Sequence, residues 1–208
     1  MLGVAQNRYR FAFCWITLLC VCVWSHGVRA NAFDEAITAY DQKNYDQAFQ
    51  QFTVLAKQGH AKAQYNLGLL YAQGIGTSKN LRQALYWYKQ AAQQKHINAM
   101  YNIGYLYQHS KKPVQDYKAA MQWYLKAAQR GSRSALVNIG EMYFYGQGMA
   151  KKDYIKAYAW FSLAASRGSR RGFHNKDLMS LRLPPMDLSR GESLYRQLRG
   201  QYLDPFLK

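Results

Sequence analysis

A block of 36 residues occurs three times in succession in the middle of this chain. The copies share an alanine, a glycine and a tyrosine, each 36 residues after its equivalent: Ala63, Ala99 and Ala135; Gly68, Gly104 and Gly140; Tyr71, Tyr107 and Tyr143. Self-similarity at a period of this size is typical of solenoids, in which each repeat contacts only its neighbours. The chain is therefore predicted to be a solenoid.

Each repeat contains two segments with the periodicity of a helix. In the first copy, Leu67 and Tyr71 lie on one side of a short first segment. The stripe on the second segment comprises Ala84, Tyr88, Ala91 and Ala92. A turn at residues 74–77 separates the two, and its two glycines permit it. A glycine inside a helix costs about 1 kcal/mol relative to alanine, so Gly68 and its equivalents indicate a helix packed closely against them.

The first copy, AKAQYNLGLLYAQGIGTSKNLRQALYWYKQAAQQKH, resembles the Sel1-like repeat (SLR), a relative of the tetratricopeptide repeat with two antiparallel helices per unit. This resemblance implies an all-α fold, a right-handed α-solenoid of antiparallel helix pairs. Two loops depart from the family pattern. The second copy has residues 108–111 in place of the glycine turn, and the third has one extra residue between its helices. Loops tolerate such changes.

The expected domain organisation places three SLR repeats at residues 61–96, 97–132 and 133–168. Residues 33–60 are predicted to form a degenerate N-terminal helix pair, since Ala48 and Ala56 precede Ala84 and Ala92 by 36 residues. A left-handed turn is expected after each second helix. Its residues are Gly59, Lys95, Gly131 and Gly168.

Residues 169–208 look like the C-terminal capping pair of many exported SLR proteins. The first capping helix carries apolar side chains at Phe173, Leu178 and Leu181. Pro185 is suited to begin the second, because its fixed φ and missing N–H fit a first turn. Leu188, Leu194, Tyr195 and Leu198 form the apolar stripe of that helix, which Asp204-Pro205 closes.

Residues 1–32 have the layout of a secretory signal peptide. Arg8 and Arg10 precede an apolar run at residues 11–24, and a polar segment then ends in small residues. Cleavage is expected after Ala32 or Ala30. The alternative is a retained N-terminal anchor, although the run is short for a membrane span. All three cysteines lie in this segment, so the expected product is an exported, periplasmic or secreted protein without disulfides.

The charge is strongly basic and unevenly distributed. The chain carries a net +17, and residues 1–32 hold three arginines and no acid, which leaves +14 for the rest. Residues 31–103 have a net charge of +3 and residues 104–208 one of +11. This asymmetry indicates an anionic partner, with plain solubility as the alternative. The candidate basic patch is Arg167, Arg170, Arg171 and Lys176, with little nearby to cancel it.

No catalytic constellation is apparent, and neither a metal nor another cofactor is expected. The histidines at 60, 96, 109 and 174 are isolated, and no metal-ligand pair stands at i, i+4. His60 and His96 mark the same corner of successive repeats and are interpreted as solvated link residues. The paired glycines lie in inter-helix turns without a preceding strand, so they do not indicate a nucleotide loop.

One polar series recurs midway along the first helices: Asn66, Asn102 and Asn138. A side-chain amide has donors and an acceptor that could grip a peptide backbone. In tetratricopeptide folds, which the repeat resembles, first helices line a concave groove. The alternative is an internal ladder in which each amide bonds the neighbouring repeat. The positions that vary between units would set the selectivity of a groove: Tyr105, Glu141, Gln108 and Phe144.

The resemblance implies a non-catalytic exported scaffold or adaptor that binds a protein or peptide partner in the cell envelope. One alternative is a cell-envelope enzyme or enzyme activator, related to β-lactam or cell-wall chemistry. Another is an electrostatic binder of an anionic envelope polymer or lipid surface. Nucleic acid is not an expected partner.

Overall fold

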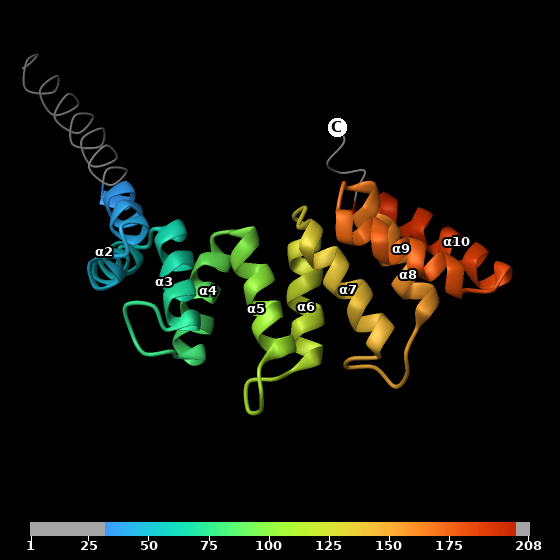
Figure 1. The fold of residues 1–208 in the computed structure, drawn as a ribbon, viewed down its shortest axis with the longest axis horizontal. Coiled ribbons are helices and arrows are strands. Elements are labelled where there is room, and N and C mark those ends of the chain that lie inside the picture. Colours follow the sequence, from blue (N-terminus) through green and yellow to red (C-terminus); the bar gives the residue numbers. More distant parts are fainter. Residues whose placement is uncertain (1–31, 203–208) are drawn as a thin grey trace, which may run out of the picture.

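The structure, a computed structural model that describes residues 32–202, is a row of α-helices (Figure 1). Residues 32–41 are helical and precede α2. The helices that follow are α2 (Tyr45–Lys57), α3 (Ala61–Gln73), α4 (Leu81–Gln93), α5 (Ile97–His109), α6 (Tyr117–Ala128), α7 (Arg133–Tyr145), α8 (Tyr154–Ser166), α9 (Arg170–Arg182) and α10 (Pro185–Tyr202). Residues 32–202 contain no strand. The chain is therefore an all-α solenoid, as predicted.

Two sequence predictions lie outside the described residues. The segment expected to be a signal peptide is described only at Ala32, and Asp204-Pro205 follows the last described residue. Within residues 32–202, no helix is long and apolar enough to cross a membrane.

The helices pack as successive pairs, α3 with α4, α5 with α6, and α7 with α8. Each second helix also contacts the first helix of the next pair. The starts of α4, α6 and α8 are capped by Asn80, Asp116 and Asp153, whose side chains accept hydrogen bonds from backbone N–H groups of the first turn. Such a cap typically contributes about 1 kcal/mol. The repeat therefore also fixes where the second helices begin.

The first helices are capped too, and this corrects the interpretation of two histidines. His60 and His96 are not merely solvated link residues, because their Nδ1 atoms accept hydrogen bonds from the backbone N–H of Ala63 and Ala99, at 3.2 and 3.3 Å. The ring of His96 also stacks on that of Tyr65, with centroids 4.5 Å apart. Ser132 and Ser169 cap α7 and α9 in the same way.

The left-handed turns after the second helices are confirmed. Gly59, Gly131 and Gly168 have φ of 88°, 94° and 78°, and Lys95 adopts a φ of 67° at the equivalent place. These turns reverse the chain between one pair of helices and the next.

The close packing predicted at the mid-helix glycines is also confirmed. The eighth residue of each first helix meets the eighth residue of its second helix. A Cβ built on Gly68, Gly104 or Gly140 would lie 2.5 to 2.7 Å from a ring carbon of the facing aromatic residue. Those residues are Tyr88, Tyr124 and Phe161. The aromatic rings therefore occupy the space that a side chain would need.

The C-terminal pair departs from the repeat. Pro185 begins α10, as predicted, but α10 packs against α8 rather than α9, and Gly191 lies against the ring of Tyr158. The eighth residue of α9 is Asp177 instead of glycine. Helix α9 therefore lacks the glycine against which the aromatic ring of a second helix packs in the repeats. In consequence the apolar side chains expected to pack are more than half exposed: Phe173 at 53%, Leu178 at 51% and Leu181 at 87%.

Candidate partner-binding surface

The first helices α3, α5, α7 and α9 together carry a surface that we call the first-helix face. Their ninth residues form a row along it, spaced by 36, 36 and 37 positions: Leu69, Tyr105, Glu141 and Leu178. Leu69 and Tyr105 line one cavity, and Glu141 and Leu178 line another. The structure thus places Tyr105 and Glu141, which the sequence analysis proposed as groove residues, on one face but in two different cavities.

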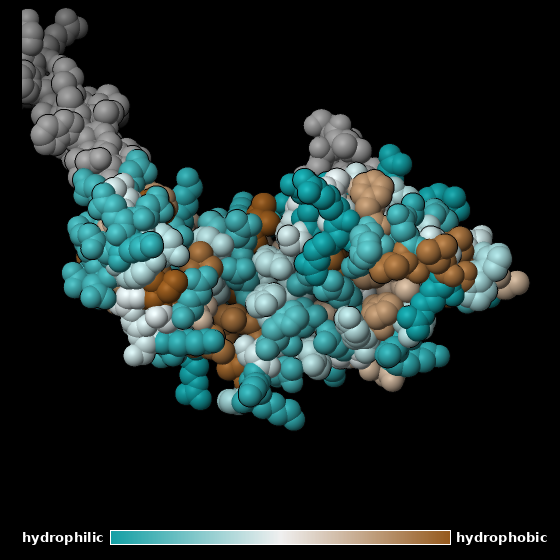
Figure 2. Space-filling model, in the orientation of Figure 1, coloured by the Kyte–Doolittle hydropathy of each residue, from teal (hydrophilic) through white to brown (hydrophobic). Residues whose placement is uncertain are grey.

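The larger cavity, which we call the α3–α5 cleft, has a volume of about 740 Å³. Its walls come from α3, α4, α5 and the loop between α5 and α6. Figure 2 shows hydrophobic surface in the region between α3 and α5. The volume lies in the range of roughly 300–1,000 Å³ that is common for ligand pockets.

The second cavity on this face is small, about 160 Å³, and lies between α7, α8 and α9. Glu141 lines it together with Phe144 and Leu178. The Glu141 carboxylate is 2.6 Å from a guanidinium nitrogen of Arg171 on the next first helix. Its charge is therefore already compensated within the protein.

The asparagines of the series differ in their surroundings. Asn138 is buried, and its Nδ2 donates a hydrogen bond of 2.8 Å to the hydroxyl of Tyr124 in the preceding repeat. The Tyr124 hydroxyl in turn donates to Oε1 of Gln108 at 2.7 Å. These contacts form the inter-repeat arrangement that the sequence analysis gave as the alternative to peptide binding. Burial raises the pKa of Tyr124, so its hydroxyl keeps its proton at neutral pH.

Asn102 has a double role because it hydrogen-bonds the preceding repeat and also lines the α3–α5 cleft. Its side chain bonds the hydroxyls of Tyr88 and Tyr65, while burial raises the pKa of both phenols. Asn66 is half-buried on α3. Of the three asparagines, Asn102 is the one that lies at a cavity of the first-helix face.

The sequence analysis missed several groups on this face. Asn175, the sixth residue of α9, continues the asparagine series and lines the small cavity. Asn175 lies 37 residues after Asn138, not 36, because the third repeat has one extra residue between its helices. Allowing for that residue would have placed Asn175 in the series. Lys79, Lys111 and Lys112 line the α3–α5 cleft from loops, where a repeat pattern carries no signal.

The candidate basic patch does not form one surface. Arg171 pairs with Glu141, so the expectation that little cancels these charges is corrected there. Arg167 donates from Nη1 to the backbone oxygen of Tyr202 at 3.0 Å, and burial lowers its pKa. Arg170 is exposed and Lys176 half-buried. Lys176 lies five residues after Arg171, about 140° further around the helix.

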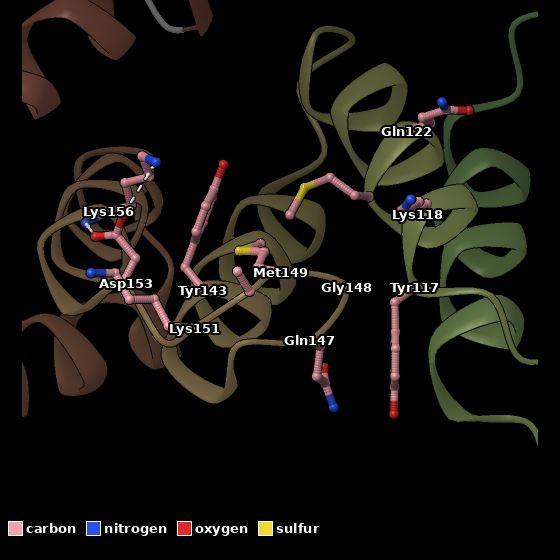
Figure 3. A pocket seen from close by; sticks show the side chains of 12 residues that line it. Tyr117, Lys118, Gln122, Tyr143, Gln147, Gly148, Met149, Lys151, Asp153 and Lys156 are labelled. Carbon is pink, nitrogen blue, oxygen red and sulfur yellow. Dashed lines mark hydrogen bonds and ion pairs between the residues drawn. The ribbon is translucent and has the colours of Figure 1, made fainter.

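A third cavity, of about 560 Å³, lies away from the first-helix face, between the start of α6 and the connection from α7 to α8 (Figure 3). Tyr117 and Met121 line it from α6, and Met149 from the connection. Its one carboxylate, that of Asp153, caps α8 and pairs with Lys156 at 3.1 Å. This acid is already used in holding the helix start.

The groups that line the α3–α5 cleft are suited to binding. Within residues 32–202, no group of three or more histidine, cysteine, aspartate or glutamate side chains could hold a metal ion. His109 lines the α3–α5 cleft with its ring 4.3 Å from that of Tyr105, and burial lowers its pKa. The cleft thus offers apolar surface, hydrogen-bonding groups and lysine charge.

Comparison with known proteins identifies three repeats in the same part of the chain. A family model described as Sel1 repeat matches residues 61–96, 97–132 and 133–169. Among solved structures, a Sel1 repeat protein from Oxalobacter formigenes is 38% identical over 69% of this chain, with a TM-score of 0.61. A protective antigen of uropathogenic Escherichia coli, c5321, which displays an SLR fold, is 27% identical over 75% of this chain, with a TM-score of 0.43.

A further solved structure, the immunity protein Pa5087 from Pseudomonas aeruginosa, is 18% identical, with a TM-score of 0.34 and coverage of 84% of this chain and 81% of that one. The match spans 60% of the length of the Oxalobacter protein and 41% of that of c5321. Comparison with curated proteins gives no match.

Proposed function

Because the chain belongs to the Sel1 repeat family, we propose that it is a non-catalytic scaffold that binds a protein or peptide partner through the first-helix face. Sel1 repeat proteins are generally protein-interaction scaffolds. We further propose that it acts after export, in the periplasm or outside the cell. The layout of residues 1–32, basic, then apolar, then small, supports export.

The α3–α5 cleft is the observation that carries this proposal. It is a concave site of about 740 Å³ on a face that runs along several repeats. Tyr105, 46% exposed, stands beside it, and tyrosine is among the residues that most often dominate binding energy. Solenoids use extended surfaces of this kind to bind their partners.

Site-specific photo-crosslinking tests the proposal in cells that produce the full chain. A photo-reactive phenylalanine analogue replaces Tyr105 on α5 in one variant and Tyr86 on α4 in the other. The two tyrosines are similarly exposed, 46% and 51%, but only Tyr105 lies on a first helix. We expect a discrete protein adduct from position 105 that is absent from position 86. Equal adducts from both positions, or an adduct from position 86 alone, would contradict the proposal.

A further inference from the structure

Three lysines surround the α3–α5 cleft. Lys79 precedes α4, and Lys111 and Lys112 lie in the loop between α5 and α6. No aspartate or glutamate lines the cleft. None of the three lysines forms a salt bridge with a carboxylate in the described part of the chain, whereas Lys156 and Arg171 do. The cleft therefore has a positive charge that no acid at the site offsets.

The cleft occurs where the repeat pattern is broken. In the first and third repeats, a glycine of the inter-helix turn lies against the first residue of the preceding second helix. A Cβ on Gly76 would collide with the backbone of Tyr45, and one on Gly148 would lie 2.9 Å from the Cβ of Tyr117. The second repeat lacks this turn, and residues 110–114 line the cleft together with Leu81, the first residue of α4.

The cleft is also apolar beneath this charge. Half-buried aliphatic side chains line it from three helices and the loop: Leu69, Ala72, Leu81, Leu106 and Val114. Such a surface favours a ligand that brings an apolar side chain out of water. An anionic polymer without apolar groups would leave this surface unused. The combination points to a peptide that carries both acidic and apolar side chains.

We propose that the α3–α5 cleft binds an acidic peptide segment of the partner protein, with carboxylates beside Lys79, Lys111 and Lys112 and an apolar side chain against Leu69 and Leu106. This inference rests on the proposed function and specifies the chemistry of the partner. The small cavity beside α9 does not share this selectivity, because Glu141 and Arg171 compensate each other there. Unpaired lysines speed the encounter with an acidic segment and reject a basic one.

The first test is selection of peptides from a random display library against the mature protein. The bound pool is counter-selected against a Lys79→Gln/Lys111→Gln/Lys112→Gln variant. We expect the enriched peptides to combine aspartate or glutamate with leucine or an aromatic residue. Enrichment of neutral or basic sequences would overturn the inference.

The second test measures the affinity of one enriched acidic peptide, fluorescently labelled, by anisotropy. The triple glutamine variant should bind roughly tenfold more weakly at low salt, which corresponds to three ion pairs of modest strength. A Lys118→Gln/Lys151→Gln/Lys152→Gln variant loses the same charge outside the cleft and should bind like the wild type. Equal losses of affinity in the two variants would show that only the net charge of the protein matters. That result would overturn the assignment of the peptide site to the α3–α5 cleft.

A Tyr105→Ala variant separates this inference from the proposed function. If neutral peptides are enriched and lose affinity in Tyr105→Ala, the first-helix face binds peptides and the acidic inference alone fails. If no peptide is enriched, or if the enriched peptides ignore both the triple glutamine change and Tyr105→Ala, both proposals fail. Thermal melts of each variant establish that loss of binding does not reflect loss of folding.

Discussion

At the scale of single residues, contact between glycine and an aromatic ring sets the distance between the two helices of a pair. Tyr88 and Tyr124 are almost completely buried, and each ring covers the glycine of the facing helix. Tyr124 cannot easily rotate away, because its hydroxyl is bonded to Gln108 and Asn138. Small changes at these positions should therefore have large effects on stability.

Gly104→Ala should destabilise the protein even though alanine is the better helix former. The new methyl group would lie 2.7 Å from Cδ1 of Tyr124, and overpacking of this kind costs roughly 1–3 kcal/mol. The matched control is Gly200→Ala in α10, where a Cβ meets nothing within 4 Å; this change should raise stability by about 0.5–1 kcal/mol. Urea unfolding measures both, and a Gly104→Ala variant as stable as Gly200→Ala would refute the packing account.

Tyr124→Phe should also destabilise the protein, for a different reason. The change keeps the ring over Gly104 but removes the hydroxyl that joins Gln108 to Asn138, and both amides are buried. A buried polar group without a partner costs roughly 1–3 kcal/mol. Thermal unfolding should show this loss. A melting temperature equal to that of the wild type would mean that the network contributes no net stability.

The sequence located these glycines but not what lies over them. Three glycines at one period imply a packed neighbour, whereas the identity of that neighbour depends on how the second helix is rotated. The asparagine series shows the same limit. Spacing places Asn102 and Asn138 at equivalent points, yet Asn138 is buried against Tyr124 and Asn102 also reaches a cleft. Cavities depend on neighbouring side chains and loops, which a period cannot specify.

At the scale of elements, the helix starts carry a dependence on pH. The Nδ1 atom of His96 accepts a hydrogen bond from the N–H of Ala99, so the cap requires an unprotonated Nδ1. Burial, with Lys62 as a smaller cause, lowers the pKa of His96 below its ordinary value of 6.5. Below about pH 6.5 the unfolded chain therefore binds a proton that the folded protein resists. Stability should fall as the pH falls, until the pH passes the lower folded pKa.

His96→Ser isolates this contribution, because Ser132 caps the equivalent helix of the next repeat. Near neutral pH and above, where His96 is neutral, the variant keeps a cap but loses the stacking of the His96 ring on Tyr65, so it should be somewhat less stable than the wild type. As the pH falls below about 6.5 it should lose less stability than the wild type, since serine does not titrate. Urea unfolding across this range is the measurement. Identical pH profiles for the two proteins would exclude a role for His96 in the acid sensitivity.

The terminal helices show where reasoning from periodicity fails. Phe173, Leu178 and Leu181 have apolar side chains at helical spacing, but α9 buries Gly172 and Met179 instead. The reason is that α10 packs against α8. A pattern of apolar residues predicts that a helix has a face, but not that another element will cover it.

At the scale of the whole molecule, the layout of residues 1–32 leads to a prediction about processing. If the protein is exported, N-terminal sequencing of the envelope-extracted form should begin at Asn31 or Phe33. A sequence that begins at residue 1 or 2 would mean that the segment is retained. In that case the protein would be membrane-anchored or not exported. The crosslinked partner would then be sought at the membrane or inside the cell.

The proposed binding surface is the first-helix face, and two tyrosines allow this face to be compared with the second helices. Tyr105 stands on the first-helix face beside the α3–α5 cleft, and Tyr86 is similarly exposed on α4. The measurement is the affinity of the crosslinked partner, once purified, for the Tyr105→Ala and Tyr86→Ala variants. The account predicts about a tenfold or greater loss for Tyr105→Ala and a change within about twofold for Tyr86→Ala. Equal effects, or a larger loss for Tyr86→Ala, would contradict it.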